Sequence, residues 1–307
     1  MEIPSSANRS QVSPRGLWLP LITPFRDGAL DETSLRRLIR HYGTLGLDGL
    51  VLAGTTGESL TLDEDETQRL VEVSADELAR QGYRLPLYLG LSGSNTRKLA
   101  KRLHRLADWP IAGHLIACPY YSRPSQAGLI AHFRVLADSS RHPILIYNIP
   151  YRTGVNIGNE AMLQLAERAD IVGAKDCCAD SAQSAELIRR RPPGFSVLTG
   201  EDAFYHAALT AGADGAILAS AHVETASFIA IRDAFARGDE PAAGAAWRSL
   251  TDLVPLLFAE PNPAAIKYWL WRTGLIDSGE LRLPMTPMSA ALAARLDGAI
   301  DRMKSAA

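Results

Sequence analysis

The sequence predicts an α/β protein, a (β/α)8 TIM barrel with a C-terminal helical extension. Short apolar runs rich in β-forming residues recur eight times, and stretches with helical spacing separate them. Beyond the eighth run, the remaining segments all have helical patterns. Parallel strands joined by helices form right-handed crossovers, and eight such units close naturally into a barrel. A doubly wound open sheet is the main structural alternative.

The expected strands are the apolar runs themselves, in chain order. They cover residues 18–22, 49–53, 85–91, 114–118, 144–147, 171–175, 196–199 and 215–219. The intervening stretches have apolar residues at helical spacing, as at Leu35, Leu38, Ile39 and Tyr42, or at Leu129, Ile130, Phe133 and Leu136. Asp63, with Glu66 three residues later, and Ser125 are expected to cap two of these helices.

The segment after Ala219 is expected to be helical. Helical patterns cover residues 224–237, 241–258, 262–273 and 289–303, and residues 282–288 form a proline-stiffened connector. We expect the barrel to occupy residues 14–223, and residues 224–307 to complete it and form the helical extension. No linker, low-complexity tract or internal repeat indicates a second domain.

Composition and charge exclude several classes of function. The chain has 307 residues, 47% of them hydrophobic, and a formal net charge of -2 with no polybasic run, so nucleic acid is not an expected partner. Residues 1–14 lack the apolar core of a signal peptide, and no stretch reaches the roughly 18 apolar residues of a membrane span. We expect a cytoplasmic protein that does not act at a membrane.

Metal and cofactor chemistry is not expected. The three cysteines, Cys118, Cys177 and Cys178, form neither a metal-binding CxxC pair nor an even disulfide framework. The seven histidines have no HxxxH or similar ligand spacing. We therefore expect reduced thiols and a mechanism without metal or cofactor.

Lys175 ends the apolar run of the sixth expected strand and is the candidate nucleophile. An ordinary lysine has a pKa of about 10.4, so its amine is protonated at neutral pH and cannot attack a carbonyl. Burial on an apolar strand lowers that pKa and favours the neutral amine. A lysine imine withdraws electrons from the neighbouring carbon and permits carbon-carbon chemistry beside a keto group. The alternative is a structural ion pair between Lys175 and Asp176.

Further polar residues gather at the same end of the expected strands. In a (β/α)8 barrel the catalytic groups lie at the C-terminal ends of the strands. That position is shared by Thr55, Thr56, Tyr120, Tyr121, Tyr147, Lys175, Gly200 and Ile217. The Gly54-Thr-Thr-Gly57 turn offers N–H groups and hydroxyls suited to a carboxylate. This inventory favours a Schiff-base enzyme acting on a small keto acid over a structural role for Lys175.

Several segments, in order along the chain, resemble one protein family. They are residues 54–59 (GTTGES), 119–124 (PYYSRP), 147–154 (YNIPYRTG), Lys175, 260–263 (EPNP) and 281–287 (LRLPMTP). The chain is similar to the dihydrodipicolinate synthase and N-acetylneuraminate lyase superfamily, and within it to the 4-hydroxy-tetrahydrodipicolinate synthases. These are (β/α)8 class I pyruvate aldolases and lyases, and the match extends from about residue 18 to 303.

The resemblance implies a role for each matching residue. Lys175 would form the imine with pyruvate, and Tyr147 would donate and accept protons. Thr55 would link Tyr147 to Tyr121, which would reach the pocket of a neighbouring subunit. Thr56 would bind the pyruvate carboxylate, with Gly200 and the main chain at Ile217 as further substrate contacts. The same reading agrees with the chemistry of a phenol, which needs a hydrogen-bonded chain to pass protons at neutral pH.

Arg152 indicates the second substrate. A guanidinium makes a two-pronged contact with a carboxylate, and the synthases have this arginine where the sialic acid lyases generally do not. We therefore expect condensation of pyruvate with L-aspartate semialdehyde, giving 4-hydroxy-tetrahydrodipicolinate, a step of lysine biosynthesis. Tyr151, where the synthases usually have serine, and residues 176–180 (DCCAD) depart from the family pattern.

Those departures leave two other functions open. The first is an aldolase that cleaves a 2-keto-3-deoxy sugar acid or a related substrate to release pyruvate. The second is a keto-acid-binding module without turnover. The presence of Lys175, Tyr147, Tyr121 and both threonines favours a catalyst.

Two properties follow from the resemblance. If Tyr121 completes the relay of a neighbour, the active protein is an oligomer, and the family points to a homotetramer built as a dimer of dimers. The region matching the lysine-inhibition site of some relatives retains Ser59, Asn95 and Tyr120. Leu99 stands there in place of an acid and Thr67 in place of a histidine, so we expect weak or absent lysine inhibition.

Overall fold

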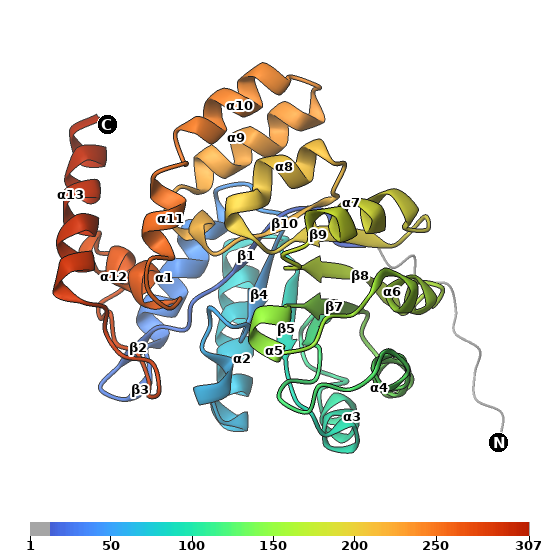
Figure 1. Ribbon diagram of the computed structural model, residues 1–307. Helices are drawn as coiled ribbons and strands as arrows, with labels where there is room; N and C mark the ends of the chain where they lie inside the picture. Colours follow the sequence, from blue (N-terminus) through green and yellow to red (C-terminus); the bar gives the residue numbers. More distant parts are fainter. Residues whose placement is uncertain (1–12, 307) are drawn as a thin grey trace.

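Eight parallel strands close into a barrel (Figure 1). The computed structural model describes residues 13–306, so most of the segment expected to lack a signal peptide lies outside the described residues. The strands are β1 (Gly16–Pro20), β4 (Gly49–Leu52), β5 (Leu87–Leu91), β6 (Gly113–Ala117), β7 (Ile144–Asn148), β8 (Ile171–Asp176), β9 (Ser196–Thr199) and β10 (Gly215–Ile217). β1 pairs with both β4 and β10, which closes the sheet. The predicted barrel is confirmed, and the open-sheet alternative is wrong.

The predicted strands are all present, and their ends differ from prediction by small shifts. The first strand shifts at both ends, because it was expected at residues 18–22 and spans Gly16–Pro20. It ends at Pro20, although the N–H of Leu21 still bonds the carbonyl of Val51 on β4. Apolar residues continue past the last ladder pair, so hydrophobicity alone places the strand ends only approximately.

A short hairpin precedes the first helix and was not predicted. β2 (Phe25–Arg26) and β3 (Ala29–Leu30) pair antiparallel across Asp27 and Gly28. Both turn residues have positive φ, 54° and 79°, as a two-residue type I′ turn requires. The Asp-Gly pair was therefore a usable hairpin signal in the sequence.

Helices cover the outside of the barrel between successive strands (Figure 1). They are α1 (Glu32–Gly43), α2 (Glu64–Gln81), α3 (Thr96–Arg105), α4 (Gln126–Ser139), α5 (Pro150–Thr153), α6 (Asn159–Ala166), α7 (Ser181–Arg190), α8 (Tyr205–Thr210) and α9 (Thr225–Ala236). Both predicted caps are confirmed. Asp63 and Glu66 form a reciprocal capping box at α2, and Ser125 accepts a hydrogen bond from the Gly128 N–H at α4.

The C-terminal extension contains four helices. They are α10 (Glu240–Arg248), α11 (Leu253–Leu257), α12 (Ala264–Arg272) and α13 (Ala290–Ala306). The single helix predicted over residues 241–258 is wrong, because α10 ends before Pro255. In one continuous helix Pro255 would lack the N–H for its backbone hydrogen bond, whereas in the first turn of α11 no such bond is needed.

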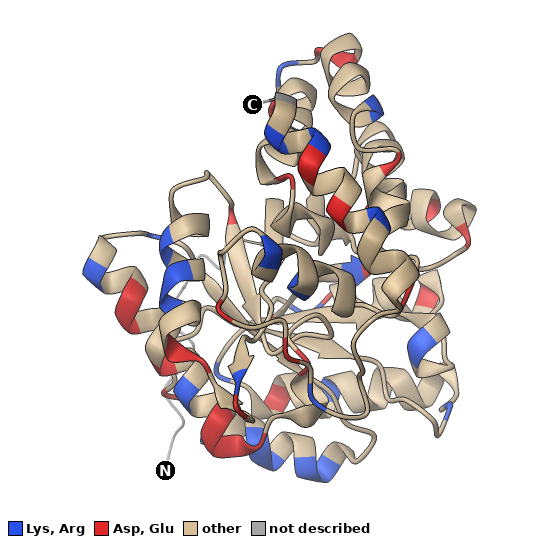
Figure 2. Ribbon diagram, turned by 90° about the vertical axis from the view of Figure 1, so that its left-hand side faces the viewer, with Lys and Arg blue, Asp and Glu red and all other residues tan. Residues whose placement is uncertain are grey.

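The barrel interior is an apolar cluster separate from the larger core beneath the helices. It contains Trp18, Val51, Tyr88, Leu115, Leu145, Tyr147, Ile149, Cys177, Leu198 and Ile217. Charged residues of both signs are instead interspersed on the surrounding helices (Figure 2). Within residues 13–306, no helix combines the length and apolar character needed to cross a membrane.

Candidate active site

Lys175 lies inside the barrel near the C-terminal end of β8. In the sheet register it is the partner of Tyr147 on β7 and Leu198 on β9, both of which belong to the interior cluster. Its side chain is buried, with 6% exposed, and its Nζ atom is 4.5 Å from the centroid of the Tyr147 ring. The strand therefore holds the amine against a phenol in an apolar interior.

Asp176 does not neutralise this amine. Neighbouring residues of a strand point to opposite faces of the sheet. The Asp176 carboxylate accepts hydrogen bonds from Asn148 Nδ2 at 3.1 Å, from the Cys178 N–H at 3.3 Å and from the Ser184 hydroxyl. Among the described residues no ion pair joins Lys175 to Asp176, so the structural alternative for Lys175 is not what the fold contains.

Burial sets the charge state of Lys175. It lowers the pKa of the Lys175 amine, because the ammonium would lose its hydration in the barrel. The negative charges of Asp202 and Glu201 and the nearby Cys177 raise the pKa and offset part of this effect. The net direction is downward, which favours the neutral amine that a nucleophile requires.

Gly200 leaves the space that the lysine occupies. A Cβ atom at this position would lie 2.3 Å from Lys175 Cε and 2.4 Å from Cys177 Sγ. Both distances are shorter than any van der Waals contact, so only glycine at the end of β9 permits the lysine to extend as it does. Ile217, fully buried at the end of β10, packs in the same interior cluster.

Tyr147 is buried and joined to Thr55. Burial raises the pKa of the Tyr147 phenol well above its usual value, and the hydrogen bond with the Thr55 side chain lowers it only in part. The phenol is therefore protonated at neutral pH. Because Thr55 is both a donor and an acceptor, it can return a proton that Tyr147 gives away.

The Gly54–Gly57 turn after β4 places the two threonines differently. Ala53, just before the turn, has a left-handed φ of 48°, which is unfavourable for a residue with a Cβ. Thr55 lines the main cavity at this end of the barrel. Thr56 is buried, and its hydroxyl oxygen accepts a hydrogen bond of 2.9 Å from Asn262 Nδ2. The C-terminal segment thus fixes the orientation of Thr56.

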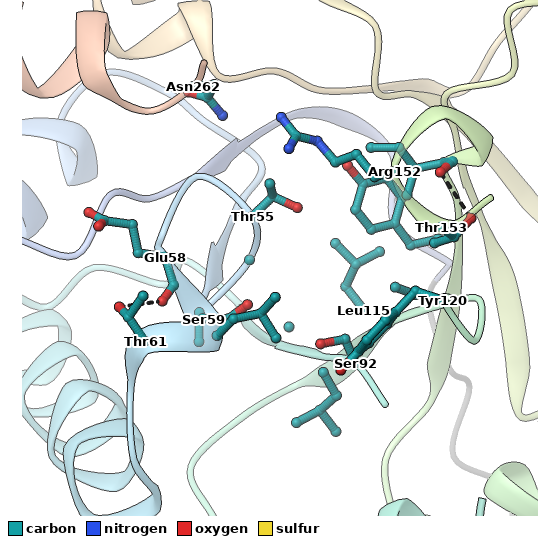
Figure 3. A pocket seen from close by; sticks show the side chains of 18 of the residues that line it. Thr55, Glu58, Ser59, Thr61, Ser92, Leu115, Tyr120, Arg152, Thr153 and Asn262 are labelled. Atoms are coloured by element: carbon teal, nitrogen blue, oxygen red, sulfur yellow. Dashed lines mark hydrogen bonds between the residues drawn. The ribbon is translucent and has the colours of Figure 1, made fainter. Parts of the chain in front are cut away.

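The cavity has a volume of about 330 Å³ and brings several predicted residues together. Thr55, Tyr120, Tyr147 and Arg152 all line it. Figure 3 shows the Arg152 guanidinium, on α5, pointing into the cavity over Thr55 and towards Asn262. The arrangement leaves an exposed cation at the mouth and a buried phenol inside.

Tyr121 lies away from this cavity. The residue is 94% exposed, more than any other large hydrophobic residue between residues 13 and 306. Its backbone has a left-handed φ of 68°, and its N–H bonds the Thr153 carbonyl of α5 at 3.1 Å. The loop is anchored beside Arg152 while the phenol extends into solvent, so its contact with a neighbouring subunit remains a prediction.

Four residues at the site were missed as functional candidates from sequence. Asn262 orients Thr56, and Cys177 packs beside Lys175. Glu201 and Asp202 follow Gly200 at the end of β9, the same position that identified the other candidates. Asp202 is buried and accepts a 2.6 Å hydrogen bond from the Ser220 N–H, and burial raises its pKa to about 6.

A (β/α)8 barrel with a buried lysine on β8 beside a tyrosine is the arrangement of a lysine Schiff-base lyase, and comparison with known proteins confirms this class. Residues 13–302 match the model of the Dihydrodipicolinate synthetase family. The chain therefore belongs to that family, as its motifs predicted.

Individual relatives agree over nearly the whole chain. The chain is 45% identical over 284 residues to 4-hydroxy-tetrahydrodipicolinate synthase 2 of Clostridium acetobutylicum, covering 92% of this chain and 98% of the relative. The crystal structure of dihydrodipicolinate synthase from Aquifex aeolicus superposes with a TM-score of 0.90 at 32% identity, covering 94% and 98%. The chloride-inhibited enzyme from Acinetobacter baumannii, complexed with pyruvate, superposes with a TM-score of 0.89 at 30% identity, covering 94% and 98%.

Proposed function

We propose that this protein is a Schiff-base lyase that condenses pyruvate with L-aspartate semialdehyde to give 4-hydroxy-tetrahydrodipicolinate. The observation that carries the proposal is the buried Lys175 amine held 4.5 Å from the centroid of the Tyr147 ring, with no ion-pair partner among the described residues. Family membership and the names of the relatives support the same activity.

The reaction begins with the imine. The neutral Lys175 amine adds to C2 of pyruvate, and the resulting carbinolamine loses water to form the imine. Tyr147 gives its proton to the departing hydroxyl and recovers a proton through Thr55, with which it is hydrogen bonded. Loss of a methyl proton then gives an enamine, whose terminal carbon is the nucleophile.

The pyruvate carboxylate binds at the threonine turn. Asn262 already donates to the Thr56 oxygen, so the Thr56 O–H is free to act as a donor to a carboxylate oxygen. The backbone N–H groups of the turn supply further donors of the kind that bind anions. Asn262 is thus a positioning residue for Thr56, and Gly200 and Ile217 bound the same space.

The second half of the reaction uses Arg152. The enamine carbon attacks the aldehyde carbon, forming the new carbon-carbon bond, and the aldehyde oxygen takes up a proton to become the 4-hydroxyl. The amino group of the second substrate then displaces the lysine amine at C2, which closes the ring and frees Lys175. Arg152 binds the carboxylate of the second substrate by a two-pronged contact at the cavity mouth.

Tyr121 is proposed to act in a neighbouring subunit. Its exposed side chain and the anchoring of its loop to Thr153 support an intersubunit contact. A two-fold interface would exchange the two Tyr121 side chains reciprocally, and two such dimers would form a tetramer. An active monomer in sedimentation experiments would contradict this assignment.

Lysine inhibition remains predicted to be weak or absent. Ser59 and Tyr120 line the main cavity, whereas Leu99 and Thr67 are buried. Neither Leu99 nor Thr67 can supply a negative charge to an inhibitor ammonium. Inhibition by sub-millimolar lysine in a steady-state assay would be inconsistent with this prediction.

Substrate turnover tests the proposal directly. We expect pyruvate to be consumed with L-aspartate semialdehyde and no pyruvate to be released from a panel of 2-keto-3-deoxy sugar acids. Release from one of those acids, without turnover of the semialdehyde, would instead identify a sugar-acid aldolase. Thermal stabilisation by pyruvate without any turnover would identify a keto-acid-binding module.

A further inference from the structure

Glu201 is a carboxylate of the site that the proposed mechanism does not use. It follows Gly200 directly at the end of β9, on the same rim as Lys175 and Tyr147. Its Oε1 atom is buried and has no hydrogen-bond partner among the described residues. A buried carboxylate oxygen without a donor is costly, and such an exception in a folded protein calls for a specific cause.

Neighbouring side chains hold this carboxylate in place. Glu201 interacts with the Tyr151 hydroxyl and the Cys177 thiol, and its negative charge contributes to the raised pKa values of both groups. Tyr151 and Cys177 lie in the two segments where this chain departs from the family pattern. The departures are therefore not independent, because both meet at Glu201.

The same tyrosine connects Glu201 to Arg152. The Arg152 guanidinium carbon lies 5.8 Å from the centroid of the Tyr151 ring, while the Tyr151 hydroxyl faces Glu201. The Tyr151 side chain thus has a cation, Arg152, over its ring and an anion, Glu201, near its hydroxyl. A ligand group with both charges on one carbon, the α-ammonium and α-carboxylate of an amino acid, complements this pair.

Other charged groups of the site are already committed. Asp202, the residue after Glu201, is buried and accepts a hydrogen bond from the Ser220 N–H. The Glu201 charge raises the pKa of Lys175, but no ion pair joins the two side chains among residues 13–306. The Glu201 oxygen is therefore the acceptor that remains for a substrate donor.

We propose that Glu201, held by Tyr151 and Cys177, binds the ammonium group of the aldehyde substrate, so that Glu201 and Arg152 together select an aldehyde with an α-amino acid end. This inference rests on the proposed function and adds a specificity-determining residue to it. A 2-keto-3-deoxy sugar acid has only hydroxyls to offer at this position and would leave the charge of Glu201 without compensation.

The test compares two aldehydes that differ only in the amino group. In Glu201→Gln the shape is kept and the charge is lost. We expect the KM for L-aspartate semialdehyde to rise on the order of 10- to 100-fold, the usual range for a lost hydrogen bond to a charged group. The inhibition constant of succinic semialdehyde, which lacks the amino group, should stay unchanged.

Two further variants serve as controls. Glu167→Gln makes the same change at an exposed position after α6, at the opposite end of the barrel, and should leave both constants unchanged. Tyr151→Phe removes the hydroxyl that holds Glu201 and should raise the KM for the semialdehyde by less than Glu201→Gln does. The final extent of borohydride trapping with saturating pyruvate alone should be the same in every variant, although its rate at a given pH can differ, and this control verifies folding and the pyruvate site.

An equal loss of apparent affinity for the two aldehydes in Glu201→Gln would overturn the inference, because Glu201 would then act on the imine and not on the ammonium. An unchanged KM for L-aspartate semialdehyde in Glu201→Gln would overturn it as well. Failure of the unmodified protein to turn over the semialdehyde is a separate outcome that rejects the proposed function itself.

Discussion

Among residues 13–306 two lysines are buried, and their surroundings differ. Lys175 lies inside the barrel near the end of β8, and Lys267 lies in α12 of the C-terminal extension, with none of its side chain exposed. The Lys267 ammonium is paired with the Glu58 carboxylate and donates to the Glu280 carbonyl at 2.7 Å. It also lies 4.2 Å from the centroid of the Phe25 ring.

The two lysines differ in their charge partners and not in their burial. Burial lowers the pKa of Lys267 to about 8, and the attraction of Glu58 opposes that shift. Lys267 thus has an anion and a carbonyl that stabilise its charged form, whereas Lys175 has a phenol ring and an apolar interior. A buried lysine that lacks a charge partner at the end of a barrel strand is the stronger candidate for covalent chemistry.

Lys267 also supports the site indirectly, through its ion pair with Glu58. Glu58 lies on the loop that follows Thr55 and Thr56. Its carboxylate also accepts a hydrogen bond of 3.1 Å from the backbone N–H of Arg282. The ion pair therefore ties the threonine turn to the C-terminal extension. We expect its loss to appear first in stability.

The largest effect is expected from Lys175→Ala. Without the amine no imine forms, so turnover should fall by a factor on the order of 10⁴ to 10⁶, as when other covalent nucleophiles are removed. The free energy of unfolding should change little, because the lost group is a poorly solvated amine. Steady-state rates and denaturant melts measure the two quantities, and retained turnover would refute the assignment.

Lys267→Met should have the reverse profile. It leaves the Glu58 carboxylate buried without its cation, which should lower the free energy of unfolding by about 3–5 kcal/mol. Folded protein should still form the imine at Lys175. The double variant Lys267→Met/Glu58→Gln should recover part of the stability, and no recovery would show that the pair does not act as a unit.

Tyr147→Phe tests the partner of Lys175. The ring and its packing remain, but the proton donor is lost, so kcat should fall by roughly 10²- to 10⁴-fold. Imine formation should slow while the KM for pyruvate changes little. Thr55→Val should show the same direction with a smaller loss if Thr55 returns the proton, and a normal kcat in Tyr147→Phe would remove the phenol from the mechanism.

The smallest effect concerns pH. Because the Lys175 pKa is lowered, the rate of imine formation should rise with pH and reach its midpoint below the ordinary lysine value. Glu201→Gln removes a charge that raises this pKa, so its midpoint should move to lower pH. The exposed Glu167→Gln should leave the midpoint in place, and a shift to higher pH in Glu201→Gln would contradict the assigned electrostatics.

The sequence predicted those features that are written locally. Each strand is an apolar run of its own, and Lys175, Tyr147 and Thr55 were predicted as site residues because strand ends meet at one face of a barrel. The Asp27-Gly28 hairpin and the break of the helix before Pro255 also had local signals, which were overlooked. Glu201 stood beside Gly200 and obeyed the strand-end rule as well.

Long-range pairs were beyond the reach of the sequence. Lys267 and Glu58 are separated by 209 positions, and Asn262 and Thr56 by 206. No periodicity relates such distant residues, so their pairing appears only when the C-terminal helices are placed against the barrel. The interactions of Glu201 with Tyr151 and Cys177 were also beyond its reach, because they join the ends of three strands, β9, β7 and β8.

The most direct test is reduction with borohydride in the presence of pyruvate, followed by peptide mass mapping. A covalent three-carbon adduct should appear on the peptide that contains Lys175 and be absent from the peptide that contains Lys267, although both lysines are buried. An unmodified Lys175 peptide, or an adduct on Lys267, would contradict the central claim that the lysine without a charge partner is the nucleophile.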